Sequence, residues 1–441
     1  MRWTVCEYPM ARLAAAAAAV AVLAVAPAGC GDDDDDDEPV VITDLGPNVV
    51  SQWNEVAYNT FALPASPTGT TPEERVPNTI DIATVQLAVY DAAMAIAGTH
   101  KPYGPRPATQ ALGAGEVAMK AAIVEAAYRT LKGLYPSRGA QYETAYADGV
   151  AALPDTAERT LGRLVGAEVA AGVLALRAND GREPVPPLEA YVPGTLPGQF
   201  RGINPVNRVA PLIRPLVTSS HAQFRAPGPA ALGSAVYAAD LNEVKDIASA
   251  TSTTRTPEQT NLAIFHTEPP NAYTARNMRR FATAQSDLAQ NARVLAMLWT
   301  SNVDGLAGCF ESKYHHNFWR PFSAIRLADT DGNDATVADA AWTPVVPTPN
   351  HPEYPGAHSC AAGGIAETLR SFYGTTKVSF QFNSLASGTT LSFDSTDELV
   401  KSNVDGRVFG GMHFRTSAQH GSELGKQVAK WMVKHYFQPV D

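Results

Sequence analysis

The segment KYHHNFWRP, residues 313–321, places two long cationic side chains near each other. Lys313 and Arg320 are seven residues apart, close to two helical turns, so they would share a face if one helix carried both. Pro321 would end or kink that helix just after Arg320. The planar fork of Arg and the point charge of Lys can converge on one anion, although cations at this spacing are more often solvated or paired with acids.

The segment NHPEYPGAHS, residues 350–359, combines a rigid turn with a histidine at the expected start of a helix. Its prolines fix the turn, and His358 precedes a helix that we expect over about 359–372. A helix start offers free N–H groups and the positive end of the helix dipole, which suits an oxyanion. His358 could exchange a proton with that anion. A capping histidine is the alternative at this position, and His351 is expected to belong to the turn.

The segment DGRVFGGMHFRTSAQHG, residues 405–421, carries a third cation and a second histidine. Arg407 and His413 are six residues apart, so one continuous helix would point them in different directions. Gly410 and Gly411 interrupt the backbone between them, which lets both side chains face one pocket. A neutral imidazole at His413 could then act as a metal ligand or as a nucleophile.

The three segments together predict an anion site rather than a site for a bare cation. They supply three cations and two histidines within about one hundred residues, and no zinc-type Cys/His spacing or acidic Ca²⁺ or Mg²⁺ loop is present. There is also no Gly-x-Ser-x-Gly elbow and no Walker-type loop. The hypothesis requires the imidazole of His413 to lie within about 12 Å of the guanidinium of Arg320, because both must reach one small guest.

The elements that would hold these segments are mainly helical, and the 441 residues suffice for one large domain or two packed ones. We predict an all-α fold of two packed helical bundles, with a small β-hairpin near 378–393. The bundles would cover 49–231, which includes a long Pro-rich crossover from about 182, and 232–441, which includes the anion site. Apolar spacing predicts helices over about 80–98, 117–134, 161–173, 237–248, 257–265, 273–287, 291–313 and 416–435.

The net charge of −10 owes much to one acidic run over residues 32–38. Without that run and the two arginines of the leader, the balance is about −5. No basic stripe is present, so nucleic acid is not expected as a partner.

Residues 1–30 have the pattern of an export signal, and 31–48 that of an acidic tether. The end of the apolar run resembles a bacterial lipoprotein processing site with Cys30 as the lipid anchor, and plain signal-peptidase cleavage is the alternative. We therefore expect a periplasmic or membrane-anchored protein, with no long apolar span after residue 30. An exported location would permit a disulfide between Cys309 and Cys360, and two buried free thiols are equally compatible with the sequence.

In this order the three segments resemble those of the vanadium-dependent haloperoxidases and the related type 2 phosphatidic acid phosphatases and bacterial acid phosphatases. The pattern of that superfamily is Lys-x6-Arg-Pro, then Pro-Ser-Gly-His, then Ser-Arg-x5-His, and its matches here cover only about 30 residues. The resemblance implies a bound vanadate with His413 as its axial ligand and His358 as the acid or base. It also implies that the vanadate oxygens contact three cations and one backbone N–H group: Lys313, Arg320, Arg407 and the amide of Ala357.

Four positions depart from the superfamily pattern. Gly356 and Gly406 replace serines, Ala357 replaces a glycine, and Ser417 stands where many members have Asp. A lost hydrogen bond to a charged group costs roughly 1.5–3 kcal/mol, so we expect weaker vanadate binding that nevertheless survives.

The resemblance implies a haloperoxidase that uses hydrogen peroxide to oxidise halide, with a small organic substrate. Family members are often oligomeric, so a homo-oligomer is compatible with it. The first alternative is an exported acid phosphatase with His413 as nucleophile, and the second is a non-catalytic lipoprotein that retains an oxyanion pocket. The aromatic pair Phe318–Trp319 and the helical scaffold favour the peroxidase.

Overall fold

The computed structural model describes residues 38–440 apart from 63–78, 183–186 and 269. The expected leader, its anchor Cys30 and residues 32–37 of the acidic run lie outside the described residues. Residues 38–441 form one unit in their contacts, and the boundary expected between 231 and 232 stays a prediction.

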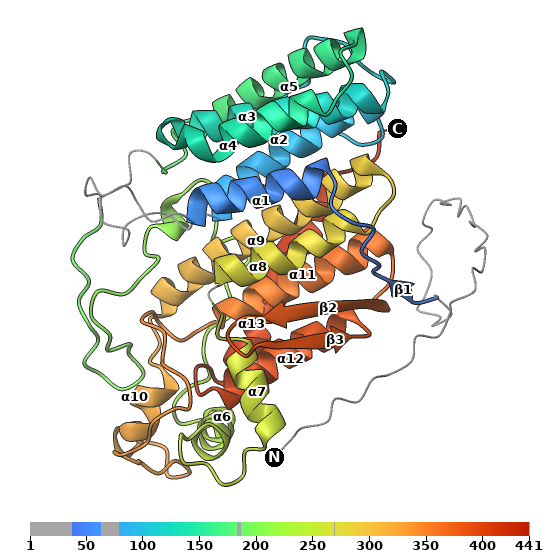
Figure 1. Ribbon diagram of the computed structural model, residues 1–441. Helices are drawn as coiled ribbons and strands as arrows, with labels where there is room; N and C mark the ends of the chain where they lie inside the picture. Colours follow the sequence, from blue (N-terminus) through green and yellow to red (C-terminus); the bar gives the residue numbers. More distant parts are fainter. Residues whose placement is uncertain (1–37, 63–78, 183–186, 269, 441) are drawn as a thin grey trace, which may run out of the picture. The chain divides into compact units, whose positions relative to one another are not determined.

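The described chain is mainly helical with one small sheet, so the predicted fold class is confirmed (Figure 1). The first five helices are α1 Val49–Ala62, α2 Thr79–Ala97, α3 Glu116–Leu134, α4 Gly139–Ala151 and α5 Ala157–Leu176. The others are α6 Ala235–Ile247, α7 Pro257–Phe265, α8 Pro270–Met278, α9 Leu288–His316, α10 Pro321–Arg326, α11 Ala357–Tyr373, α12 Thr396–Phe409 and α13 Arg415–His435. Short 3-10 helices span Pro136–Arg138, Ala210–Leu212, Arg279–Thr283 and Ala328–Thr330.

One predicted helix is wrong in extent. The pattern over 273–287 predicted a single helix, but α8 ends at Met278 and a 3-10 helix follows it. The side chain of Asp287 accepts a hydrogen bond of 2.9 Å from the N–H of Ala289, so this aspartate caps the next helix, α9.

The sheet has three strands in the order β1 (Val40–Val41), β2 (Val378–Ser384) and β3 (Thr389–Phe393). The antiparallel pairing of β2 with β3 confirms the predicted hairpin. Strand β1 pairs in parallel with β2 and lies within the segment that we expected to be a tether.

Helix α9 organises the C-terminal half of the chain, because it contacts α2, α11 and α13 (Figure 1). Most of its 29 residues are buried, from Ala289 to Lys313. Burial on several sides fixes the position of the last turn of α9, where Lys313 lies.

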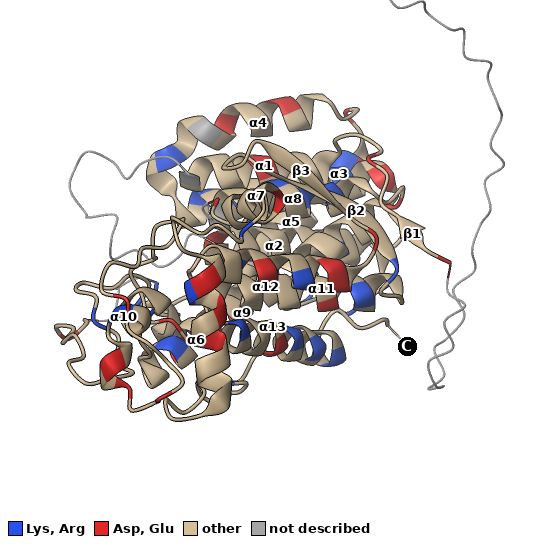
Figure 2. Ribbon diagram, turned by 90° about the horizontal axis from the view of Figure 1, so that it is seen from below, with Lys and Arg blue, Asp and Glu red and all other residues tan. Residues whose placement is uncertain are grey.

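Charged side chains of both signs are interspersed on the described helices, as Figure 2 shows.

Helix α2 is long and apolar enough to cross a membrane by length and composition, contrary to our expectation for the chain after residue 30. Within the protein, however, 89% of this stretch is buried. Its side chains pack against α3, α5 and α9, as expected of the core helix of a folded domain.

Two glycines of α13 bring this helix into backbone contact with α11. A Cβ atom at Gly425 would lie 1.9 Å from the carbonyl oxygen of Cys360, and one at Gly421 would lie 2.5 Å from that of Gly356. Only glycine allows this approach, which sets the distance between the start of α11 and the start of α13.

The described part of the Pro-rich crossover contains a single short 3-10 helix and is anchored to α9 by Asp304. The buried carboxylate of Asp304 accepts hydrogen bonds of 2.8–2.9 Å from the N–H groups of Leu216, Val217 and Thr218. One charged side chain therefore satisfies three donors of a segment with little regular structure.

We expect Asp304→Ala to lower the free energy of unfolding by about 2–4 kcal/mol, because it leaves three N–H groups without their acceptor. Urea unfolding of the variant and of Asp329→Ala, which removes an exposed carboxylate, measures the difference. Equal stability of the two variants would contradict the anchoring role.

Candidate functional site

Lys313 and Arg320 do not share one helix, so that prediction is wrong. Helix α9 ends at His316, and Asn317 follows in the left-handed conformation with φ 47°. Arg320 precedes a new helix that begins at Pro321, the position at which proline costs no hydrogen bond. Both side chains nevertheless reach the turn over residues 351–355.

Lys313 is completely buried and uses all three of its N–H donors on this turn. Its Nζ donates to the carbonyl oxygens of Pro352 at 3.0 Å, of Glu353 at 2.8 Å, and of Pro355. Burial lowers the pKa of Lys313 to about 8. The ammonium therefore holds the turn that leads into α11, and its direct contact with an anion stays a prediction.

Arg320 joins the turn to the residues before α13. Its Nε donates to the carbonyl oxygen of His351 at 2.8 Å, and its Nη1 donates to that of Met412 at 2.7 Å. The same Nη1 lies 3.2 Å from Nε2 of His413, well inside the required limit of about 12 Å. His351, which we expected to belong to the turn rather than to line the pocket, is buried with Nδ1 2.9 Å from Nη2 of Arg320.

His413 follows α12 through a tight turn at two glycines, as the sequence indicated. Gly411 has φ 74°, and a Cβ atom there would lie 2.7 Å from Cβ of Pro344. The turn points the imidazole of His413 at two partners, with Nδ1 2.9 Å from Oε1 of Glu353 and Nε2 next to Arg320. Burial, and then the charge of Arg320, keep the pKa of His413 well below its usual value, so the ring is neutral.

Arg407 and His358 complete the group and hold buried nitrogen atoms that have no hydrogen-bond partner within the protein. Nη1 of Arg407 donates to the carbonyl oxygen of His266 at 2.7 Å, whereas Nε of Arg407 and Nε2 of His358 have no partner. Burial lowers the pKa of Arg407 to about 9. Burial, and then the charge of Arg407, hold the pKa of His358 well below its ordinary range. His358 lies beside Ala357, the first residue of α11, whose N–H has no acceptor within the helix.

Positive charge is in excess at this site. Among the described residues, no carboxylate comes within 4.0 Å of the side-chain nitrogens of Lys313, Arg320 or Arg407, although all three are almost completely buried. Glu353 is the carboxylate that contacts the group, through His413. Buried cations without counter-charges are costly, so this arrangement favours a bound anion.

The donor set fits a tetrahedral oxyanion. Three groups have no hydrogen-bond partner among the described residues: Nε of Arg407, Nε2 of His358 and the N–H of Ala357. The oxygen atoms of an XO4 group can accept hydrogen bonds from the two N–H groups and exchange a proton with the imidazole. The part of the chain that the structure describes has no group of three or more His, Cys, Asp or Glu side chains that could hold a bare metal ion. Vanadate, which needs a single imidazole ligand, and phosphate both match this set.

Packing explains why position 406 has glycine instead of the serine of the superfamily pattern. A Cβ atom at Gly406 would lie 2.6 Å from Cδ2 of His266 and 2.9 Å from the carbonyl oxygen of Leu262. The ring of His266 therefore occupies the space that a serine side chain would need at position 406. Its own nitrogens lie 3.0 Å from the hydroxyl of Ser402 and 3.3 Å from Nδ2 of Asn403, so His266 forms a wall of the site.

Cys309 and Cys360 are free, buried thiols, one of the two alternatives that the sequence left open. Sγ of Cys309 lies 3.6 Å from the carbonyl oxygen of Pro355, which also accepts from Lys313. The two thiols belong to the apolar cluster that surrounds the site, together with Trp319, Tyr354 and Phe414. This cluster keeps water away from the charged group, which strengthens its electrostatic interactions.

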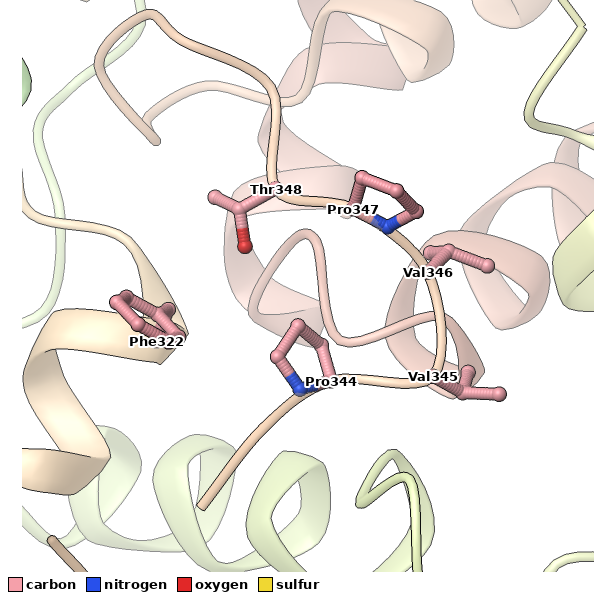
Figure 3. A pocket seen from close by; sticks show the side chains of 6 residues that line it. All are labelled: Phe322, Pro344, Val345, Val346, Pro347 and Thr348. Carbon is pink, nitrogen blue, oxygen red and sulfur yellow. The ribbon is translucent and has the colours of Figure 1, made fainter. Parts of the chain in front are cut away.

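An apolar pocket of about 410 Å³ lies beside the site (Figure 3). Its lining consists of Phe322, Pro344, Val345, Val346, Pro347 and Thr348. The pocket adjoins the turn before His413, because Val346 and Pro344 pack against Gly410 and Gly411. No charged side chain lines it, so it is separate from the oxyanion site.

Comparison with known proteins supports the same family. Residues 293–441 match the family model described as the VCPO second helical-bundle domain. A bacterial vanadium-dependent iodoperoxidase is similar in structure with a TM-score of 0.67 and 19% identity, over 88% of this chain and 96% of that one. A bacterial vanadium-dependent chloroperoxidase in its holo form gives a TM-score of 0.63 and 15% identity, over 86% and 96% of the two chains.

The apo form of a bacterial vanadium-dependent chloroperoxidase gives a TM-score of 0.62 and 16% identity over the same shares of the two chains. No curated protein sequence matches the chain significantly. The match at residues 293–441 includes Lys313, Arg320, His358, Arg407 and His413. In its fold, the chain is similar to bacterial vanadium-dependent haloperoxidases, and residues 293–441 match the second helical-bundle domain of that family model.

Proposed function

We propose that this protein is a vanadate-dependent haloperoxidase that uses hydrogen peroxide to oxidise halide. The observation that carries the proposal is the neutral imidazole of His413, whose Nε2 lies beside Arg320 in a buried, cation-rich site. The structural neighbours, an iodoperoxidase and chloroperoxidases, are described as vanadium-dependent. Bound vanadate would supply a Lewis acid that activates hydrogen peroxide without a change in its own oxidation state.

The residues of this chain would perform three tasks in that reaction. Nε2 of His413 would hold the vanadium, while Arg320 and Arg407 neutralise the oxyanion. His358 is neutral and its Nε2 has no protein partner, so it is suited to accept the proton that hydrogen peroxide loses. Lys313 holds the turn that positions Ala357 and His358 at the start of α11.

The proposal extends to the cellular location and to the second substrate. We propose that the protein works outside the cytoplasm, because residues 1–30 have the pattern of an export signal. The apolar pocket at Phe322 and Thr348 offers a place for a small organic molecule close to the site of oxidation. Figure 3 shows the hydroxyl of Thr348 on the side of Phe322 and Pro344, where it could bind a polar group of that molecule.

An exported acid phosphatase is the second candidate. The same Nε2 of His413 could attack phosphorus, and His358 would then protonate the leaving alcohol. That step needs a protonated His358, whereas burial and Arg407 favour its neutral form. The neutral form favours the peroxidase. The third candidate is a non-catalytic protein, in which the excess positive charge would bind phosphate without a reaction.

One pair of assays distinguishes the candidates. We expect the purified protein, loaded with vanadate, to oxidise bromide or iodide in the presence of hydrogen peroxide, measured by halogenation of a phenol dye. Hydrolysis of an aryl phosphate without vanadate is measured in parallel. Phosphatase activity alone would refute the peroxidase, and inactivity in both assays would support the non-catalytic alternative.

We expect His413→Ala to lose at least about 1000-fold of the halide-oxidising activity, because the variant lacks the nitrogen that holds vanadium. Circular dichroism should show a folded protein, since the substitution only removes side-chain atoms. The exposed His435 at the end of α13 provides the matched control, and His435→Ala should retain full activity. An active His413→Ala enzyme would disprove the assigned role.

A further inference from the structure

Among the described residues, the carboxylate of Glu353 is the one acid in contact with the imidazole of His413. Sequence reasoning assigned it no role. It is fully buried, and its Oε1 accepts hydrogen bonds from Nδ1 of His413 at 2.9 Å and from the N–H of Phe414 at 3.0 Å. We propose that Glu353 is the positioning residue that fixes the orientation of His413 and holds its proton on Nδ1, so that Nε2 is unprotonated and can donate its electron pair. This proposal rests on the oxyanion site of the proposed function.

The hydrogen bonds around the ring determine where its proton lies. Nη1 of Arg320 lies 3.2 Å from Nε2 and can only donate, so Nε2 must accept. A neutral imidazole with an accepting Nε2 carries its proton on Nδ1. Nδ1 therefore donates to Oε1 of Glu353, which also accepts from Phe414. Every contact of the ring agrees with the tautomer that can bind a metal through Nε2.

Two main-chain hydrogen bonds fix the position of Glu353 itself. Its N–H donates to the carbonyl oxygen of Phe318 at 2.9 Å, and its carbonyl oxygen accepts from Nζ of Lys313 at 2.8 Å. The carboxylate thus lies on a segment that is anchored on both sides, which keeps the imidazole in one orientation.

The position of Glu353 also explains why Ser417 can replace the Asp that many superfamily members have. Ser417 lies four residues after His413 on α13, and its hydroxyl lies near the carboxylate of Glu353. A carboxylate from the turn before α11 therefore performs the task that an acid on α13 could perform. In its ionised form, the carboxylate beside Nδ1 increases the basicity of Nε2 and should strengthen its bond to vanadium.

Glu353→Gln separates this role from general support of the fold. The amide is close in shape and can still accept from Nδ1, but it removes the negative charge. We expect the affinity for vanadate, measured by equilibrium dialysis and by ⁵¹V NMR, to fall about 10- to 100-fold. The affinity for inorganic phosphate should stay equal or rise, because phosphate binds here without a bond to Nε2 and the site has become more positive.

The control is Glu423→Gln, which changes an exposed glutamate of α13 and should alter neither affinity. An equal loss of vanadate and phosphate binding in Glu353→Gln would show a purely structural role and overturn the proposal. Unchanged vanadate affinity would overturn it as well.

A second measurement does not depend on vanadate. In ¹⁵N-histidine NMR of the full chain, with the signals of His413 assigned by their loss in His413→Ala, we expect a proton on Nδ1 and none on Nε2. In Glu353→Leu, Nδ1–H loses its acceptor, so its proton signal should move upfield and exchange faster with water; an unchanged signal would overturn the proposal. A proton on Nε2 in the unaltered protein would overturn the proposal. Failure of the wild-type protein to bind vanadate would instead count against the proposed function and leave this test intact.

Discussion

The site depends on one electrostatic constraint, the burial of two guanidinium groups and one ammonium group that have no carboxylate partner among the described residues. Each of these cations would be far more favourable in water, so each must recover hydrogen bonds within the protein. Lys313 recovers them completely from the carbonyl oxygens of one turn, and Arg320 recovers them from His351, Met412 and the ring of His413. Arg407 keeps an Nε without a partner. The excess charge that remains gives the site its preference for an anion.

This constraint explains the surrounding architecture. The cations contact main-chain oxygens at the ends of helices and in the turns between them, where carbonyl groups are free of helical hydrogen bonds. The chain leaves the helical conformation after α9, at Asn317, and after α12, at Gly411. The first change lets Arg320 reach the turn over residues 351–355, and the second turns His413 toward Arg320. The apolar cluster around Trp319 and Tyr354 then excludes water. Helices set the distances between the three segments, and the irregular segments provide the chemistry.

The sequence predicted the helical fold and the hairpin, and it singled out Arg320 and His413, which lie side by side in the structure, because residue types and spacing are local signals. It could not show that α9 ends before Arg320, because the pattern over 313–321 is equally compatible with one helix and with two. It also missed the contacts of Glu353, His351 and His266, which join segments up to 141 residues apart. Glu353 lies in a Pro-rich turn, where an acid indicates little by itself. The missing acid at Ser417 was the signal that could have directed attention to it.

The contact of α11 with α13 at Gly421 and Gly425 restricts the relative motion of these two helices. Since their backbones are in direct contact, neither helix can shift or tilt without displacing the other. His358 and the turn that carries His413 are thereby tied to one rigid pair, and their separation is insensitive to thermal motion elsewhere in the chain. The distance between His358 and His413 is thus determined by two residues that have no side chain.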